Sequence, residues 1–153
     1  MLKLKIPPPV WFLLCAALMW WIARLLPAYL PNYQHSVILM LAMVIVVIGL
    51  LIAISAIITI RKAKTTSSPF QPQNTIQLVD WGIYRKSRNP MYLSLLLGLI
   101  AWALWLGSIF AWIIPPLFIW LITHFQIQPE EQILTQKFGQ RYLDYARQVR
   151  RWL

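Results

Sequence analysis

Two short segments of this very apolar chain hold the side chains that could do chemistry. One is GIYRKSRNPMYLS, residues 82–94, where basic side chains including Arg88 run into a proline and an apolar stretch. The other contains Glu130 and Glu131, two of only four acidic residues in the chain. A guanidinium beside a helix N-terminus binds a carboxylate or phosphate well. Ordinary helix-end anchoring by these bases and ordinary first-turn positions for these acids are the alternatives.

Three apolar stretches must position these segments. Residues 10–26 carry one charge, residues 36–60 carry none, and residues 91–125 carry none apart from a titratable histidine. Because roughly 20 apolar residues cross a bilayer core, the first two stretches predict single spans and the third predicts a hairpin that turns at residues 107–108. With 59% hydrophobic and 12% charged residues, the chain cannot supply the polar surface of a soluble domain. We therefore predict an all-α integral membrane protein with about four transmembrane helices, the last two a hairpin.

Local signals predict where the later helices begin. Asn89 is expected to cap the third transmembrane helix and Pro90 to be its first residue. Ser108 is expected to cap the returning helix, which Pro115 and Pro116 should bend. After it, a cytoplasmic amphipathic helix is expected to begin at Pro129, because apolar side chains recur there at helical spacing with charges between them.

The basic residues indicate the orientation of the chain. The net charge is +10, and in a four-span topology thirteen of the fourteen Lys and Arg residues fall on one side. The positive-inside rule makes that side cytoplasmic, with both termini inside. A bacterial cytoplasmic membrane is expected, or the endoplasmic reticulum membrane for a eukaryotic chain. No nucleic-acid-binding motif accompanies the bases, so no nucleic acid partner is expected.

Several single features have plain interpretations. Lys3 and Lys5 before an apolar run resemble a signal peptide, but bulky side chains such as Trp21 occupy the place of a cleavage site, which favours an uncleaved span. Cys15 is alone in an apolar stretch and is expected to be a packed thiol. His124 has no cysteine or second histidine nearby, so no metal site is predicted; interfacial packing is favoured over cofactor contact.

The two polar segments together resemble a known family. GIYRKSRNPMYLSLLLGLIAWALWLGS followed by PEEQILTQKFGQRYLDYARQVRRWL is similar to the membrane methyltransferases related to isoprenylcysteine carboxyl methyltransferase and phospholipid N-methyltransferase. That family's pattern is Arg-His-Pro-x-Tyr at a helix entrance, then Glu-Glu, Leu, Phe-Gly, two tyrosines and a late arginine. The resemblance covers about residues 78–153. Asn89 stands where the family has histidine, so a role that needs an imidazole is in doubt.

The resemblance implies S-adenosylmethionine as methyl donor, S-adenosylhomocysteine as its product, and a lipophilic acceptor that enters from the membrane. The acceptor would be a prenylated cysteine carboxylate or a phospholipid amine. It implies catalytic roles for Arg88, which would hold the donor's carboxylate, and for Glu131, which could take a proton from an amine. The donor-binding residues implied are Arg88, Asn89, Pro90, Tyr92, His124, Glu130, Glu131, Tyr142, Tyr145 and Arg150.

The expected organisation is a single membrane domain, residues 1–153. Residues 1–60 would form two transmembrane helices, residues 61–89 a cytoplasmic loop, and residues 90–153 the hairpin and C-terminal helix that bind the donor. Two alternatives stay open. One is a membrane reductase that uses NADPH, as in steroid-reductase-like families, which share the arginine-proline-tyrosine motif but have Pro-Asn-Tyr where this chain has Pro90-Met91-Tyr92. The other is a non-catalytic membrane subunit with a basic lipid-binding face.

Overall fold

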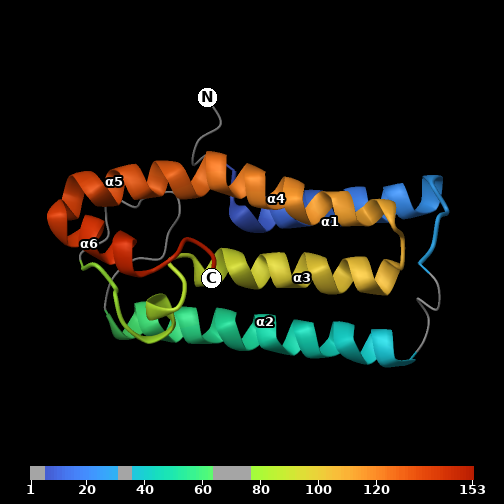
Figure 1. Ribbon diagram of the computed structural model, residues 1–153, viewed down its shortest axis with the longest axis horizontal. Coiled ribbons are helices and arrows are strands. Elements are labelled where there is room, and N and C mark those ends of the chain that lie inside the picture. The colour runs from blue at the N-terminus through green and yellow to red at the C-terminus, as the bar shows by residue number, and fades with distance from the viewer. Residues whose placement is uncertain (1–5, 31–35, 64–76) are drawn as a thin grey trace.

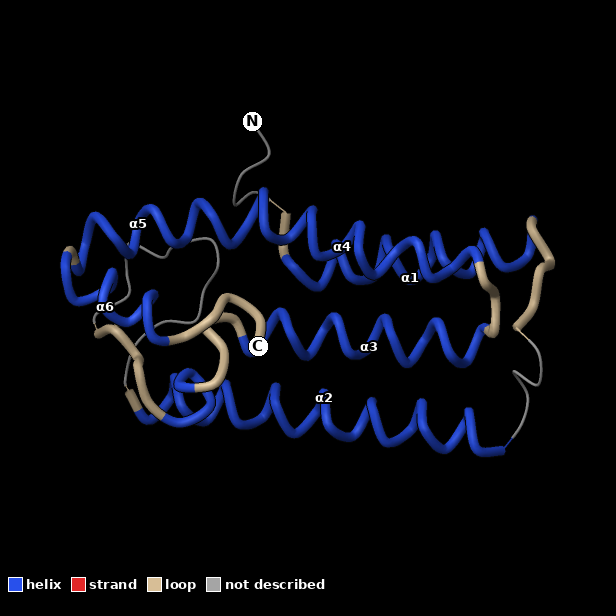
Figure 2. Tube along the Cα trace, in the orientation of Figure 1, coloured by secondary structure: helices blue, strands red, loops and turns tan. Residues whose placement is uncertain are grey.

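The fold is helical throughout the part of the chain that the structure describes. A computed structural model describes residues 6–30, 36–63 and 77–153, so the expectations for Lys3 and Lys5 lie outside the described residues. Within these ranges no strand is present (Figure 2). The all-α prediction is confirmed. The elements are α1 (Pro8–Leu25), α2 (Ser36–Lys62), η2 (Gly82–Arg85), α3 (Pro90–Leu106), η3 (Phe110–Ile113), α4 (Ile114–Ile122), η4 (Thr123–Ile127), α5 (Gln128–Phe138) and α6 (Gln140–Gln148).

Four apolar helical stretches form the membrane part. By length and hydropathy, α1, α2 and the helical run Phe110–Phe138 are able to cross a membrane. The fourth stretch, α3, has 17 residues, which at 1.5 Å per residue gives a length of about 26 Å, close to the thickness of a bilayer core. The predicted membrane fold with four apolar helices is confirmed.

The helix α3 lies at the centre of the bundle. It runs between α2 on one side and α1 with α4 on the other (Figure 1). The core that these helices share contains Met19, Leu99 and Phe118, each fully buried. A hydrogen bond from Trp102 Nε1 to the carbonyl of Ala16, 3.1 Å long, joins α3 to α1. The outer faces of α1 and α2 are lined by exposed leucine, valine and isoleucine side chains, as a lipid-facing surface requires.

The turn between α3 and α4 is fastened to the segment after α1. Gly107 ends α3 with φ +64°, in the left-handed region that glycine adopts without strain. Leu30 N donates to the carbonyl of Gly107 at 2.7 Å, and Ile109 N donates to that of Ala28 at 3.0 Å. The expectation that Ser108 caps the next helix is wrong. Its hydroxyl is buried without a partner, and the first hydrogen bond at η3 runs from Ala111 N to the backbone carbonyl of Ser108 at 3.2 Å.

Prolines lie at two places along the helical run Phe110–Phe138. Pro115 and Pro116 lie in the first turn of α4, directly after η3, and the bend expected at this point stays a prediction. The helix α5 begins at Gln128, one residue before the predicted start at Pro129, and it continues the helical run from α4 without a break. The turn before it is widened: the N–H of Gln128 bonds to Thr123 O, five residues back. We attribute this wide turn to Pro129, which lacks an N–H for the carbonyl four residues earlier.

The C-terminal segment forms two helices where one was expected. Gly139, with φ +54°, separates α5 from α6 and reverses the chain direction. Tyr142 and Tyr145 of α6 are buried against Leu78, with Leu134, Phe138, Ala146 and Val149 around them. The chain then returns, so that the C-terminus lies beside the start of α3 (Figure 1).

Candidate functional site

The loop before α3 is held between α2 and α6. Gly82 has φ +62° and lies against α2, where an added Cβ would be 3.0 Å from Thr59 Oγ1. On the other side, the hydroxyl of Tyr145 donates to the carbonyl of Tyr84 at 2.7 Å. A glycine is required here both for its positive φ and for the close contact. The residues from Gly82 to Asn89 therefore have a fixed position relative to α6.

The C-terminal tail is bound along the entrance of α3. The backbone N–H of Arg88 donates to the carbonyl of Arg150 at 3.0 Å. The side chain of Asn89 donates from Nδ2 to the carbonyl of Arg151 at 3.0 Å, and the hydroxyl of Ser87 donates to the same carbonyl at 3.4 Å. Asn89 precedes α3 as expected, but its side chain forms no cap hydrogen bond, since it binds the tail instead. Pro90 is the first residue of α3, as predicted.

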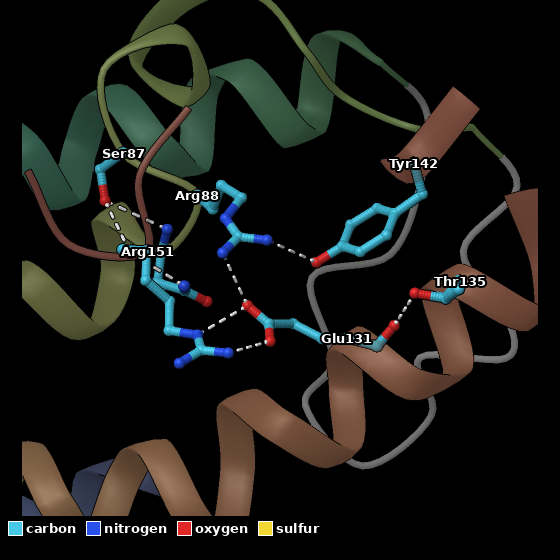
Figure 3. Close-up of polar contacts among 7 residues, drawn as sticks. Ser87, Arg88, Glu131, Thr135, Tyr142 and Arg151 are labelled. Carbon is cyan, nitrogen blue, oxygen red and sulfur yellow. Dashed lines mark hydrogen bonds and ion pairs between the residues drawn. The ribbon is translucent and has the colours of Figure 1, made fainter. Parts of the chain in front are cut away.

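Glu131 lies between two guanidinium groups at this end of the bundle (Figure 3). Arg88 Nη2 is 3.2 Å from Glu131 Oε1. Arg151 donates to both carboxylate oxygens, from Nε to Oε1 at 2.9 Å and from Nη2 to Oε2 at 2.7 Å. The side chains of Arg88 and Glu131 are only 13% and 16% exposed. We call Arg88, Glu131 and Arg151 the ion cluster. The hydrogen bonds that Arg151 donates to Glu131 raise the pKa of Arg151 above its usual value.

The guanidinium of Arg88 keeps donor capacity in this cluster. Its Nη1 donates to the hydroxyl of Tyr142 over 3.5 Å, a long contact. Its Nε is buried and has no hydrogen-bond partner. Burial raises the pKa of Tyr142 to about 12, the charge of Glu131 adds to the shift and Arg88 opposes it. A buried guanidinium N–H without a hydrogen-bond partner is costly, so Arg88 has one unmet hydrogen-bonding requirement.

Glu130 makes a different contact from Glu131. The hydroxyl of Tyr92, a buried residue of the first turn of α3, donates to Glu130 Oε1 at 2.6 Å. Glu130 precedes Glu131 in α5, so this bond joins α5 to α3 beside the ion cluster. The structure thus brings together Arg88, Asn89, Pro90, Tyr92, Glu130, Glu131 and Tyr142 from the set predicted to bind the donor.

Two predicted residues have other surroundings. His124 is exposed, and its ring stacks on Trp120 with a centroid separation of 5.7 Å and an interplanar angle of 3°. The side chain of Arg150 is exposed, and only its carbonyl takes part at the entrance of α3. Arg151, which the sequence did not single out, supplies the guanidinium. Among the residues described, no group of three His, Cys, Asp or Glu side chains could hold a metal ion.

A cavity of about 550 Å³ opens between the loop before α3 and α6. Tyr145 lines it, and neither Arg88 nor Glu131 does. Sequence reasoning missed the other lining residues; the available signal was Asp80, one of four acids in the chain, directly before a tryptophan. The remaining lining residues are Asp80, Trp81, Arg85, Arg141, Asp144, Gln148 and Val149.

Comparison with known proteins identifies related sequences. Residues 37–141 match the family model described as phospholipid methyltransferase. A Haemophilus influenzae protein described as uncharacterized is 56% identical over 63 residues, which are 41% of this chain and all of that protein. Protein-S-isoprenylcysteine O-methyltransferases A and B of Arabidopsis thaliana are 28% and 27% identical over 116 residues, which are 76% of this chain. The match spans 59% of the length of each plant protein. No solved structure matches the chain.

Proposed function

Since the chain belongs to the phospholipid methyltransferase family, we propose that it transfers a methyl group from S-adenosylmethionine to a lipophilic acceptor at the membrane surface. The family match favours methyl transfer over a reductase that uses NADPH and over a non-catalytic subunit. The observation that carries the proposal is the ion cluster at the entrance of α3. There, the side chain of Arg88 is 13% exposed, its buried Nε has no partner, and it stands at the boundary between an apolar bundle and a polar segment.

Arg88 is the residue that we assign to the carboxylate of the donor. Its Nε has hydrogen-bonding capacity to spare, and the adjoining N-terminus of α3 adds a favourable dipole for a negative group. Glu130, fixed by Tyr92, is placed to accept from the donor's amino group. The carboxylate and the amino group of the donor would then contact Arg88 before α3 and Glu130 of α5, respectively.

Glu131 has a positioning role in this proposal. Both of its carboxylate oxygens are already engaged by two guanidinium groups. It fixes the planes of Arg88 and Arg151 and keeps the tail over the entrance of α3. The role of base that the sequence suggested for Glu131 is better suited to Glu130 when the acceptor is an amine, because Glu130 contacts a neutral hydroxyl and no arginine in the described contacts.

The donor supplies an electrophilic methyl group on a sulfonium, and the protein needs to supply alignment and a site without water. The start of α3 provides both. Tyr92 is buried there against an apolar core that contains Leu96 and Phe118, and the tail covers the entrance with backbone hydrogen bonds. A carboxylate acceptor would attack without losing a proton, whereas an amine acceptor would release one to a nearby base.

The names of the relatives suggest two classes of methyl acceptor. The plant relatives are named for methylation of isoprenylcysteine, and the family model is named for phospholipids. In both cases a hydrophobic tail would remain in the membrane beside the bundle while the polar group meets the cluster. The distribution of basic residues favours a cytoplasmic location for this end and for both termini, in a bacterial cytoplasmic membrane or an endoplasmic reticulum membrane.

Calorimetry on the detergent-purified chain tests the donor assignment. S-adenosylhomocysteine is expected to bind and NADPH is not. Arg88→Ala should remove binding while leaving the amount of inserted, folded protein unchanged. Lys86→Gln is the matched control, because Lys86 is an exposed base two residues away in the same loop. Binding of NADPH, or of neither ligand by folded protein, would refute the assignment.

A further inference from the structure

The cavity between the loop before α3 and α6 lies at the level where the apolar surface of α2 ends. Ile57 and Ile58 are 38% and 46% exposed, as lipid-facing side chains are, and basic residues follow in the last turn of α2. The loop packs against this end of α2 (Figure 1), since an added Cβ at Gly82 would be 3.0 Å from Thr59 Oγ1. Trp81 lines the cavity and is 37% exposed. Because tryptophan is enriched where a bilayer meets water, the cavity opens at the level of the lipid headgroups.

The cavity is separate from the ion cluster. Tyr145 lines the cavity, Tyr142 contacts Arg88, and the two rings are buried with centroids 6.2 Å apart. The hydroxyl of Tyr145 is fixed by its 2.7 Å hydrogen bond to the carbonyl of Tyr84. A ligand in the cavity therefore meets a different set of charges from a ligand at Arg88.

Arg85 supplies an available cation to the cavity. Its side chain is exposed, and among the described residues it forms no ion pair. The other arginine of the cavity, Arg141, is already paired with Asp80 at 3.5 Å. A guanidinium group presents neighbouring N–H donors that match the oxygens of a phosphate group. Arg85 is therefore able to bind a phosphate without losing an existing ion pair.

Asp144 supplies an anion to the same cavity. Gln140 Nε2 at 2.8 Å and Arg147 Nη1 at 3.3 Å both contact its Oδ1. Among the described contacts, Oδ2 of Asp144 receives none. This oxygen attracts an ammonium group, and the ring face of Trp81 provides a second attraction for a cation, a quaternary ammonium included. The cavity thus has a place for a positive group as well as for a negative one.

The overall charge of the cavity favours a ligand that is itself neutral. Two carboxylates, Asp80 and Asp144, balance two guanidinium groups, Arg85 and Arg141. A zwitterion preserves this balance, whereas a free phosphate or an anionic lipid adds an uncompensated negative charge. At about 550 Å³ the cavity is large enough for a lipid headgroup.

We infer that this cavity holds the headgroup of a zwitterionic phospholipid, with the phosphate at Arg85 and the ammonium group between Asp144 and Trp81. The acyl chains then run along the exposed apolar face of α2, which ends beside the cavity. This lipid is a bound structural lipid and not the methyl acceptor, because Tyr142 and Tyr145 separate its headgroup from Arg88. It joins the loop before α3 to α6 and so stabilises the arrangement that positions Arg88.

Calorimetry on the full chain in a maltoside detergent tests this inference with three probes. Short-chain phosphatidylcholine carries a phosphate and an ammonium group, short-chain phosphatidylglycerol carries the phosphate alone, and inorganic phosphate is a free anion. Phosphatidylcholine is expected to bind at least about tenfold more tightly than the other two. Its nitrogen has no place for a further methyl group, so its binding does not depend on the proposed function.

Two variants locate the headgroup. Arg85→Gln should weaken both lipids about tenfold, because it removes the charged donor for the phosphate. Asp144→Asn should weaken phosphatidylcholine about tenfold and leave phosphatidylglycerol unchanged. Lys86→Gln is the matched control and should change neither, since Lys86 is exposed beside Arg85 and does not line the cavity. Arg85 and Asp144 are exposed, so their substitution should not prevent folding, which a thermal melt checks.

The outcomes separate this inference from the proposed function. Equal affinity for the three probes would overturn the zwitterionic site, and unchanged binding in both Arg85→Gln and Asp144→Asn would overturn its place in the cavity. A tenfold loss of S-adenosylhomocysteine affinity in these two variants would also overturn it, because the donor would then occupy the cavity. Failure of the folded wild-type chain to bind S-adenosylhomocysteine would refute the proposed function and leave a specific phosphatidylcholine site standing.

Discussion

Arg151 forms a two-point ion pair with Glu131, in which Nε and Nη2 lie 2.9 Å and 2.7 Å from the two carboxylate oxygens. This contact joins the segment after α6 to the first turn of α5. Arg88 approaches the same carboxylate from the start of α3. Glu131 of α5 therefore connects the C-terminal tail with the loop before α3.

Substitution of Arg151 should destabilise the fold far more than substitution of Arg150. We expect Arg151→Ala to lower the free energy of unfolding by about 1–2 kcal/mol, a moderate value because the Arg151 side chain is 39% exposed. It should also loosen the tail, which limited proteolysis at the C-terminus would detect. Arg150→Ala is the matched control, since that side chain is exposed, and it should change neither quantity. Equal effects of the two substitutions would contradict the assignment.

Removing Glu131 should be more damaging than removing either arginine. Glu131→Ala would leave two guanidinium groups close together without their anion, one of them 13% exposed. Breaking such a pair costs about 3–5 kcal/mol in buried sites. We expect a strongly reduced melting temperature in detergent, with Glu131→Gln intermediate. A stability of Glu131→Ala equal to wild type would show that the cluster does not hold the segments together.

The hydrogen bond between Tyr92 and Glu130 should give a measurable coupling free energy in a double-mutant cycle. Tyr92→Phe removes the donor of a 2.6 Å hydrogen bond to a carboxylate, and the expected loss of stability is about 1–3 kcal/mol. In a double-mutant cycle, Glu130→Gln combined with Tyr92→Phe should cost less than the sum of the single changes. Additive losses, measured by chemical unfolding, would mean that the two side chains do not interact.

The burial of Tyr142 predicts a loss of stability at high pH. Its pKa rises from 10.0 in the unfolded chain to about 12 in the fold. Above about pH 10, the unfolded chain releases this proton before the folded protein does, so unfolding is favoured as the pH rises. Two pKa units correspond to about 3 kcal/mol, lost between about pH 10 and 12. Tyr142→Phe should flatten that part of the stability curve; an unchanged slope would contradict the burial of this hydroxyl.

The apolar helices could be predicted from the sequence because hydropathy and length decide them locally. The stretch 36–60 is uncharged over more than a bilayer's length and forms α2, and Gly107 ends α3 where a turn was expected. The junction at Pro129 could not be predicted. A proline after an apolar stretch normally starts a helix, but here a widened turn lets one helical run continue.

The candidate site could be predicted in part for the same reason. Arg88 and Glu131 lie at helix entrances on one side of the membrane, so their approach was foreseeable. Arg150 and Arg151 were not distinguishable, because the chain leaves the helical conformation at Val149 and helical spacing no longer tells which side chain turns inward. Asn89 matched an N-cap pattern, but the tail carbonyl that its side chain binds is 62 residues away in the sequence.

Transfer of an isotopically labelled methyl group tests the central claim most directly. The purified chain in lipid nanodiscs is incubated with methyl-labelled S-adenosylmethionine, membrane lipid extract and, separately, a prenylated cysteine analogue, and the organic phase is analysed by mass spectrometry. We predict label in one of the two acceptors with the wild-type chain and with Lys86→Gln, and none with Arg88→Ala. Absence of label from both acceptors, in folded protein that also fails to bind S-adenosylhomocysteine, would contradict the account.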